Sequence, residues 1–177
     1  MPTIKPIFKT VLLLTSLFFT QQTLAVDKTF FELVTEGDGT SRLNGAHFIT
    51  YIESNSSTWA PYVGGGLVYV ELPDADDNFP AVQLLTGFDH MFNKSFGLNF
   101  EFGLDLGEYF LSNGEEKGLP SAVEESNDVD FSIAAGVVVK FDRTAYLKVY
   151  GRYHQFDGTY LPSTSVNFAG LRFGMKF

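Results

Sequence analysis

Large apolar side chains alternate with glycine and cationic side chains in the last stretch of the chain, SVNFAGLRFGMKF at 165–177. One parity holds Ala169, Leu171, Phe173, Met175 and Phe177, and the other holds Gly170, Arg172, Gly174 and Lys176. Successive side chains of a β-strand point to opposite faces, so the pattern predicts a strand between two different environments. Chain ends fray in water, where such a pattern brings no gain. We therefore expect the apolar face to contact lipid.

The same alternation runs through the segments 96–111, 129–141 and 145–157. A charged side chain that faces lipid near the bilayer midplane costs about 2–4 kcal/mol, so the charged parity should face inward. The pattern is weaker in 28–36 and 43–53, and the register leaves open whether His47 or Thr50 faces lipid.

Eight segments have the length of a tilted membrane-crossing strand, about 9–11 residues or more. They are 28–36, 43–53, 59–72, 80–92, 96–111, 129–141, 145–157 and 165–177. An even number of strands suits a bacterial barrel, and closure leaves no unpaired backbone edge in hydrocarbon. The predicted fold is all-β, an eight-stranded antiparallel up-and-down transmembrane β-barrel.

Short and long connections alternate along the chain. The turns NSSTW, NKS and DRT are short, whereas GDGTSR, PDADDN, SNGEEKGLPSAVEESND and GTYLPSTS are expected as longer loops. Short turns on the periplasmic side are typical of outer-membrane barrels. Aromatic residues should then form a girdle at each membrane interface. The expected girdles are Trp59, Phe92, Phe96, Phe141, Tyr146 and Phe177 beside the short turns, and Tyr69, Phe79, Tyr109, Phe110, Phe131, Phe156 and Tyr160 beside the long loops.

The first 25 residues have the pattern of a cleaved Sec-type signal peptide: Lys5 and Lys9, a short apolar run at 11–19, and Thr23-Leu24-Ala25. The domain organisation expected is a signal peptide at 1–25 and an outer-membrane barrel at 26–177. Loss of two lysines with the 25 residues leaves 10 basic and 21 acidic side chains, a net charge of −11. Such an acidic chain argues against a nucleic-acid partner, which needs clustered cations.

The chain has no cysteine, which excludes disulfides, a thiol nucleophile and a Cys-ligated metal. No cofactor is expected, and the spacing of His47, His90 and His154 suggests no metal site. The run Gly64-Gly65-Gly66 is expected where the wall bends or bulky neighbours need room.

The interior of an eight-stranded barrel is just wide enough for side chains to fill it. We expect a plugged interior with no open pore, in which glycines lie beside an ionic network. That network is predicted to contain Glu32, Asp89, Glu101, Asp105, Lys140, Lys148, Arg152, His154 and Arg172. Glu101 and Asp105 are expected to pair with the strands on either side of their own.

The stretch PYVGGGLVYV at 61–70, the eight-strand spacing and the closing GLRFGMKF resemble the small outer-membrane barrels of the OmpA transmembrane-domain and OmpX type. The resemblance covers the whole of 26–177. It implies that Phe173, Met175 and Phe177 form a signal for the barrel-assembly machinery. It implies no single activity, because members of the superfamily include structural, adhesive and enzymatic barrels.

His154 invites comparison with lipid A deacylases, which are built on barrels of this size. Phe156 stands where the nucleophilic serine would be, and Asn167 stands where an acid would be, so no triad is evident. The acidic loops are a second candidate site. Their carboxylates offer oxygen ligands for divalent cations that bridge to lipopolysaccharide, although a solvated acidic surface is the simpler interpretation.

The leading hypothesis is a non-enzymatic barrel of the outer membrane in a Gram-negative-type cell envelope. It would act structurally or through contacts of its surface loops with an external partner, among outer-membrane lipids and lipopolysaccharide. The alternatives are a lipid A-modifying enzyme that uses His154 and a periplasmic lipocalin-like barrel. The lipocalin alternative requires the opposite parity, with apolar side chains inside around a ligand.

Overall fold

The computed structural model describes residues 28–56, 58–73, 79–106, 130–156 and 164–177. The expected signal peptide, the longest loop and much of two other loops lie outside these residues. Within them, no helix is long and apolar enough to cross a membrane. The strands are β1 (Thr29–Gly37), β2 (Arg42–Tyr51), β3 (Trp59–Glu71), β4 (Phe79–Met91), β5 (Phe96–Asp105), β6 (Asp130–Lys140), β7 (Ala145–Phe156) and β8 (Thr164–Lys176).

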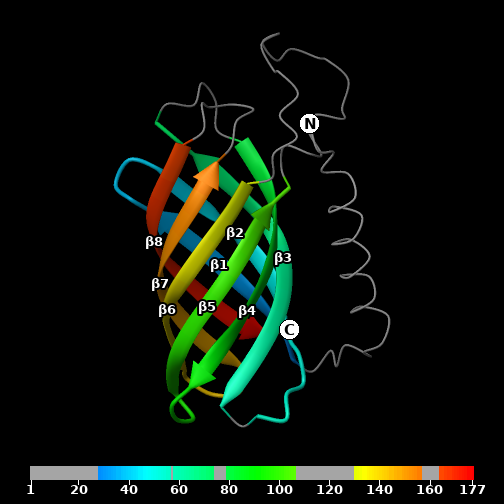
Figure 1. Cartoon of the computed structure of the whole chain (residues 1–177). Coiled ribbons are helices and arrows are strands. Elements are labelled where there is room, and N and C mark those ends of the chain that lie inside the picture. Colours follow the sequence, from blue (N-terminus) through cyan, green and yellow to red (C-terminus); the bar gives the residue numbers. More distant parts are fainter. Residues whose placement is uncertain (1–27, 57, 74–78, 107–129, 157–163) are drawn as a thin grey trace, which may run out of the picture.

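The eight strands form one closed antiparallel barrel in sequence order (Figure 1). β1 closes the barrel by pairing with β8, from Phe30 opposite Lys176 to Gly37 opposite Ala169. The predicted fold class is confirmed, and the expected strand limits agree within two residues. The exception is β5, which was expected to reach residue 111; its described part ends at Asp105.

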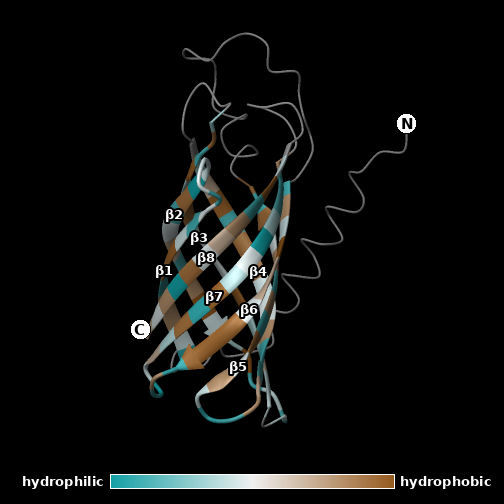
Figure 2. Cartoon of the chain, turned by 90° about the vertical axis from the view of Figure 1, so that its left-hand side faces the viewer, coloured by the Kyte–Doolittle hydropathy of each residue, from teal (hydrophilic) through white to brown (hydrophobic). Residues whose placement is uncertain are grey.

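The expected parity is also confirmed. On β5, Phe96, Phe100 and Phe102 are exposed on the outer wall, whereas Asn99 and Glu101 are buried inside. Figure 2 shows that apolar and polar residues also alternate along the other strands. The outer wall thus carries an apolar belt, defined by Leu33, Phe48, Leu67, Leu84, Phe100, Phe102, Ile133, Val149, Leu171 and Phe173, each of them exposed.

The register of β1 and β2 shows which of His47 and Thr50 faces lipid, a question that the sequence left open. Glu32 lies opposite His47, and both side chains are fully buried in the lumen. Thr50 therefore points outward, where its hydroxyl lies 3.0 Å from that of Thr29. This contact provides each hydroxyl with a partner beside lipid.

The connection GDGTSR is a tight turn, contrary to the expectation of a longer loop. β1 continues to Gly37 and β2 begins at Arg42, which leaves residues 38–41 for the turn. Asp38 Oδ1 accepts hydrogen bonds from the backbone N–H of Thr40 and Ser41, at 2.8 and 2.6 Å. These bonds lower the pKa of Asp38. Gly39 adopts a φ of 99°, which side chains disfavour.

Two residues expected in the aromatic girdles lie inside the barrel instead. Tyr146 and Phe156 are buried, because they share the inward parity of Lys148 on β7. Trp59, Phe92, Phe96, Phe141, Phe177 and Tyr69 do lie exposed on the outer wall or its rim. The expected girdle residues Tyr109, Phe110 and Tyr160 lie outside the described residues.

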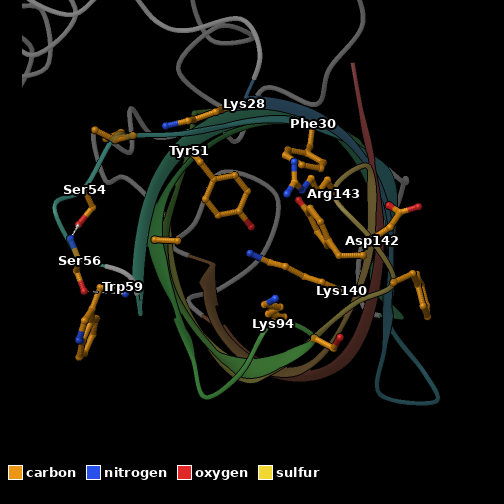
Figure 3. Close-up of a pocket in the computed structure, with 15 residues that line it drawn as sticks. Lys28, Phe30, Tyr51, Ser54, Ser56, Trp59, Lys94, Lys140, Asp142 and Arg143 are labelled. Carbon is orange, nitrogen blue, oxygen red and sulfur yellow. Dashed lines mark hydrogen bonds between the residues drawn. The ribbon is translucent and has the colours of Figure 1, made fainter.

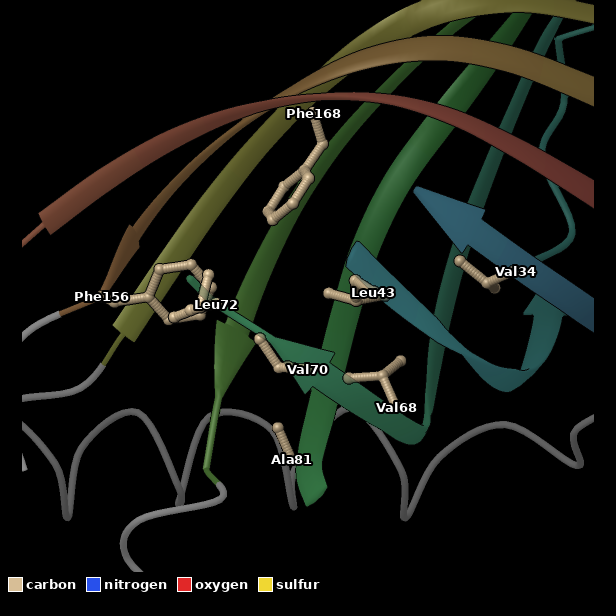
Figure 4. Close-up of a cluster of buried hydrophobic side chains, with 8 residues drawn as sticks. All are labelled: Val34, Leu43, Val68, Val70, Leu72, Ala81, Phe156 and Phe168. Carbon is tan, nitrogen blue, oxygen red and sulfur yellow. The ribbon is translucent and has the colours of Figure 1, made fainter. Parts of the chain in front are cut away.

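An apolar cluster fills the lumen at the end where β3 and β7 finish (Figure 4). We call this the long-loop end, and the end of the three turns 52–58, 92–95 and 141–144 the short-turn end. The cluster consists of Val34, Leu43, Val68, Val70, Leu72, Ala81, Phe156 and Phe168. The sequence predicts glycines and ionic groups inside the barrel, so this apolar cluster differs from the prediction.

The glycine run of β3 gives room to side chains of β2. A Cβ added at Gly66 would lie 2.5 Å from Cδ2 of His47, and one at Gly64 would overlap the side chain of Ile49. Both neighbours are fully buried. The expectation that bulky neighbours need space here is confirmed.

Candidate functional site: the ionic network of the lumen

Glu101 is the centre of a buried network of charges across the lumen. Its carboxylate accepts two hydrogen bonds from the guanidinium of Arg172, at 2.5 and 2.6 Å. Arg152 donates a third at 2.8 Å. The three residues come from β5, β8 and β7, and all are at most 5% exposed. Charge-assisted bonds of this bidentate kind are among the strongest that side chains make.

Glu32 on β1 is a second centre of the network. It lies 3.4 Å from the ammonium of Lys148 and 3.5 Å from Nη1 of Arg172. Lys148 in turn lies 3.7 Å from Asp89. The network therefore connects strands on opposite sides of the barrel through side chains that water does not reach.

Tyrosine hydroxyls also donate hydrogen bonds to the carboxylates. Tyr146 donates to Glu32 at 2.5 Å and Tyr150 to Glu36 at 2.5 Å. Tyr51 donates to Asp89 at 2.6 Å, and Tyr62 to Glu101 at 2.9 Å. Four carboxylates (Glu32, Glu36, Asp89, Glu101) thus face three permanent cations (Lys148, Arg152, Arg172), and the hydroxyls stabilise the surplus negative charge.

Several members of this ionic network were not predicted from the sequence. Glu36 lies 3.3 Å from Nε of Arg152, and Gln83 Oε1 accepts a hydrogen bond from His47 Nε2 at 3.0 Å. Each has the inward parity of its strand, which was the signal that identified Glu32 and Asp89. The inward tyrosines have this parity too. Aromatic residues also suit the membrane interfaces, so residue type alone does not show whether a tyrosine lies inside the barrel or at an interface.

The structure brings six of the nine residues predicted for the network into direct contact: Glu32, Asp89, Glu101, Lys148, Arg152 and Arg172. Asp105 and His154 lie apart from these, 3.8 Å from each other. Lys140 lies at the short-turn end, with its ammonium 5.4 Å from the ring centre of Tyr51. The ion-pair partners of Glu101 come from β7 and β8 across the lumen. The expectation that they come from the adjacent strands is therefore wrong.

His154 is buried in the lumen between the ring of Phe156 and the carboxylate of Asp105, which lies 3.8 Å from its Nε2. Its ring stacks on Phe156, with 3.9 Å between the ring centres, and neither ring nitrogen has a hydrogen-bond partner. Asn167, on the neighbouring strand, has the outward parity and is exposed. A triad needs nucleophile, base and acid in hydrogen-bond contact. Phe156 offers no nucleophile and Asn167 points away from the lumen, so the two positions compared with a deacylase triad do not form one with His154.

Three aromatic side chains lie across the lumen between the ionic network and the short-turn end. The rings of Phe30 and Tyr146 are 5.0 Å apart, and Tyr51 lies 5.6 Å from Phe30 and 6.4 Å from Tyr146. We call this group the aromatic floor. It separates the network from the opening at that end.

In the part of the chain that the structure describes, no group of three or more His, Asp or Glu side chains is arranged to hold a metal ion. His90 faces outward beside Trp59, with 4.6 Å between the ring centres. Of the acidic loop residues, Glu71 ends β3, whereas Asp74, Asp76 and Asp77 and the longest loop lie outside the described residues.

A closed antiparallel barrel with an apolar outer wall and buried charges inside defines the class of small membrane-embedded β-barrels. A search of solved structures agrees with this class. The fold is similar to that of the Yersinia pestis outer membrane protein Ail in a phospholipid bilayer nanodisc, with a TM-score of 0.54 and 13% sequence identity. The match covers 84% of this chain and 98% of the Ail chain. No family model and no curated protein matches the sequence.

Proposed function

We propose that this protein is an integral outer-membrane barrel of a Gram-negative-type envelope, with a structural or surface-interaction role and no enzymatic activity. The observation that carries the proposal is the apolar belt. Leu67 is 64% exposed and Ile133 is 54% exposed, while Arg172 on the opposite face of the wall is 1% exposed. Only a hydrocarbon environment makes this inside-out arrangement favourable.

The observed parity is the opposite of the one that a lipocalin-like barrel needs. Such a barrel binds its ligand among apolar side chains inside and presents polar residues to water. Here the centre of the lumen holds Glu101, Arg152 and Arg172 in direct contact. A lipid A-modifying enzyme likewise gains no support, because Phe156 stands where its serine would be and Asn167 points outward.

The filled lumen supports a role other than transport through a pore. The apolar cluster occupies the long-loop end, the ionic network the middle, and the aromatic floor lies beyond it. A structural or adhesive role is then left to the outer wall and the loops. The acidic loops would face the outside, where divalent ions can bridge carboxylates to lipopolysaccharide phosphates or where an external partner binds.

The closing residues support assembly by the barrel-insertion machinery. Phe173, Met175 and Phe177 are all exposed on the outer wall, where a receptor can contact them before β8 is covered by lipid. Phe177 is the most exposed of the three at 77%. We propose these three residues as the assembly signal.

The location is tested by cell fractionation of the native chain. We expect it in the outer-membrane fraction, extracted only by detergent, with a folded form that migrates differently on gels after boiling. Protease added to whole cells should cut the long loops but leave the strands protected. Recovery of folded, monomeric protein from the soluble periplasmic fraction would overturn the proposal.

A further inference from the structure

The short-turn end of the barrel opens into a cavity of about 790 Å³ above the aromatic floor. Its walls come from the start of β1, the end of β6 and the three short turns. In Figure 3, Tyr51, Lys140 and Lys94 project into the ring of strands, whereas Trp59 lies on the outside. We call this cavity the basic vestibule.

The charge of the basic vestibule is opposite to that of the chain. Its cationic lining residues are Lys28, Lys94, Lys140 and Arg143, and its only acidic one is Asp142. The whole chain has a net charge of −9. Four cations around one opening therefore create a local positive potential that an acidic protein does not otherwise have.

The carboxylates nearby leave part of this positive charge unneutralised. Asp142 Oδ1 is occupied by its own turn, accepting hydrogen bonds from the backbone N–H and hydroxyl of Thr144 and from the N–H of Ala145. Glu53 pairs with Lys28 at 3.0 Å. Among the described residues, Lys94 and Arg143 have no ion pair.

The aromatic floor makes the basic vestibule a blind pocket. Phe30, Tyr51 and Tyr146 all line it and also cover the ionic network. A ligand therefore enters and leaves only through the short-turn end. Three serines, Ser54, Ser56 and Ser95, add hydroxyl groups to the rim.

We propose that the basic vestibule binds a phosphate-bearing anion from the periplasmic side. Phosphate oxygens match the donors of one guanidinium and several ammonium groups, and they accept from hydroxyls as well. The exposed aromatic residues Trp59 and Phe141 also line the cavity, and aromatic residues of this kind lie at the headgroup level. The anion is thus either the headgroup of an anionic phospholipid in the periplasmic leaflet or a soluble phosphate compound. The source of the ligand depends on the proposed membrane orientation. The chemistry of the site does not depend on it.

The test is a titration of the refolded, isotope-labelled protein in a neutral detergent, followed by the amide NMR signals of residues 93–95 and 140–144. The probes are inorganic phosphate, dihexanoyl phosphatidylglycerol and zwitterionic dihexanoyl phosphatidylcholine. We expect saturable shifts at these amides with at least one of the two anionic probes. A response to the anionic lipid alone assigns the site to headgroups, and an equal response to inorganic phosphate assigns it to soluble phosphate compounds.

The variant is the double substitution Lys94→Gln and Arg143→Gln, with Arg42→Gln as the matched control. Lys94 and Arg143 lie in exposed turns and Arg42 is exposed at the long-loop end, so all these variants should fold. We expect the double variant to bind the anionic probe about tenfold more weakly or worse, and the control to bind as the native chain does. Shifts that do not saturate, an equal response to the zwitterionic lipid, or unchanged binding by the double variant would each overturn the proposal. Because binding is measured in detergent, a failure here is separate from a failure of the outer-membrane location.

Discussion

Arg172 and Glu101 form a bidentate pair across the lumen although they are 71 residues apart in the chain. They belong to β8 and β5, which are not neighbours in the barrel. The pair therefore joins opposite walls that share no backbone hydrogen bonds. Arg152 binds the same carboxylate, so a single acidic side chain contacts two guanidinium groups, and Glu32 and Glu36 provide further negative charge beside them.

Loss of the charge of Glu101 is expected to be strongly destabilising. Glu101→Gln keeps the shape of the side chain but replaces one carboxylate oxygen with an amide NH2, which cannot accept the hydrogen bonds that Arg152 and Arg172 donate. Breaking a buried pair in this way costs about 3–5 kcal/mol of the free energy of unfolding. Urea unfolding of the protein refolded into lipid vesicles measures the loss.

The control for this variant is Glu53→Gln, which breaks the exposed pair with Lys28. Exposed ion pairs contribute about 0–1 kcal/mol. If Glu101→Gln were no more destabilising than this control, the network would not be a bracing element of the barrel.

The strands of the barrel and the faces of their residues were largely predictable from the sequence. The contacts among side chains in the lumen were less predictable. Alternation from Phe96 onward sets the face of every residue in β5 to β8, because a wrong parity would put charges into lipid. The same rule identified Glu32 and Asp89 as inward residues. It fails to name partners, since these depend on how far the strands tilt and shift relative to one another. Glu101 was accordingly assigned to the wrong strands.

Other differences arise where residue type and parity disagree. Tyr146 and Phe156 were placed at the interfaces because they are aromatic, although their parity is inward. At the long-loop end the lumen holds apolar residues such as Val70 and Phe168, so the rule of polar side chains inside no longer applies there. Alternation was too weak in β2 to choose between His47 and Thr50, and only pairing with β1 decides it.

The filled lumen predicts that the native barrel conducts poorly. In planar bilayers we expect no large, stable single-channel conductance, because the aromatic floor and the apolar cluster both block the path. A porin inserted in the same bilayers provides the control for detection. Long-lived openings of porin size in the native chain would contradict a plugged interior.

The turn aspartate Asp142 predicts a pH dependence at the short-turn end. Hydrogen bonds from the hydroxyl and N–H of Thr144 and from the N–H of Ala145 lower its pKa below the ordinary value of 3.8. A carboxyl with a lowered pKa stabilises the folded turn above the unfolded pKa, and this contribution is lost as the pH falls through the folded value. An NMR titration of the Asp142 carboxyl should give a midpoint below 3.8.

The matched control is Thr144→Val, which removes the hydroxyl donor and keeps the side-chain shape. It should raise the pKa of Asp142 toward the ordinary value without changing the direction of the pH effect. A midpoint at or above the ordinary value in the native chain would show that the turn does not form as described.

Removal of Phe177 is expected to affect assembly more than stability. The residue is 77% exposed, its ring centre lies 5.9 Å from that of Phe48, and its N–H donates to the carbonyl of Thr29 at 2.9 Å. The truncated chain should refold into vesicles in vitro, whereas the amount of folded protein in the outer membrane of cells should fall several-fold. Phe92→Leu is the control, since it alters an exposed rim aromatic outside the closing strand. An equal loss of folded protein from the outer membrane in both variants would show that Phe177 is not part of an assembly signal.

A cation placed on the apolar belt tests the contact with lipid most directly. Val149 lies near the middle of β7 and is 44% exposed on the outer wall. Val149→Arg should cost about 2–4 kcal/mol in vesicles, because the guanidinium would lie near the bilayer midplane. Phe92→Arg, at the short-turn rim, should cost only about 0–1 kcal/mol. Urea unfolding gives both values, and this difference with depth is specific to a bilayer: equal costs for the two variants would mean that the belt is not surrounded by hydrocarbon.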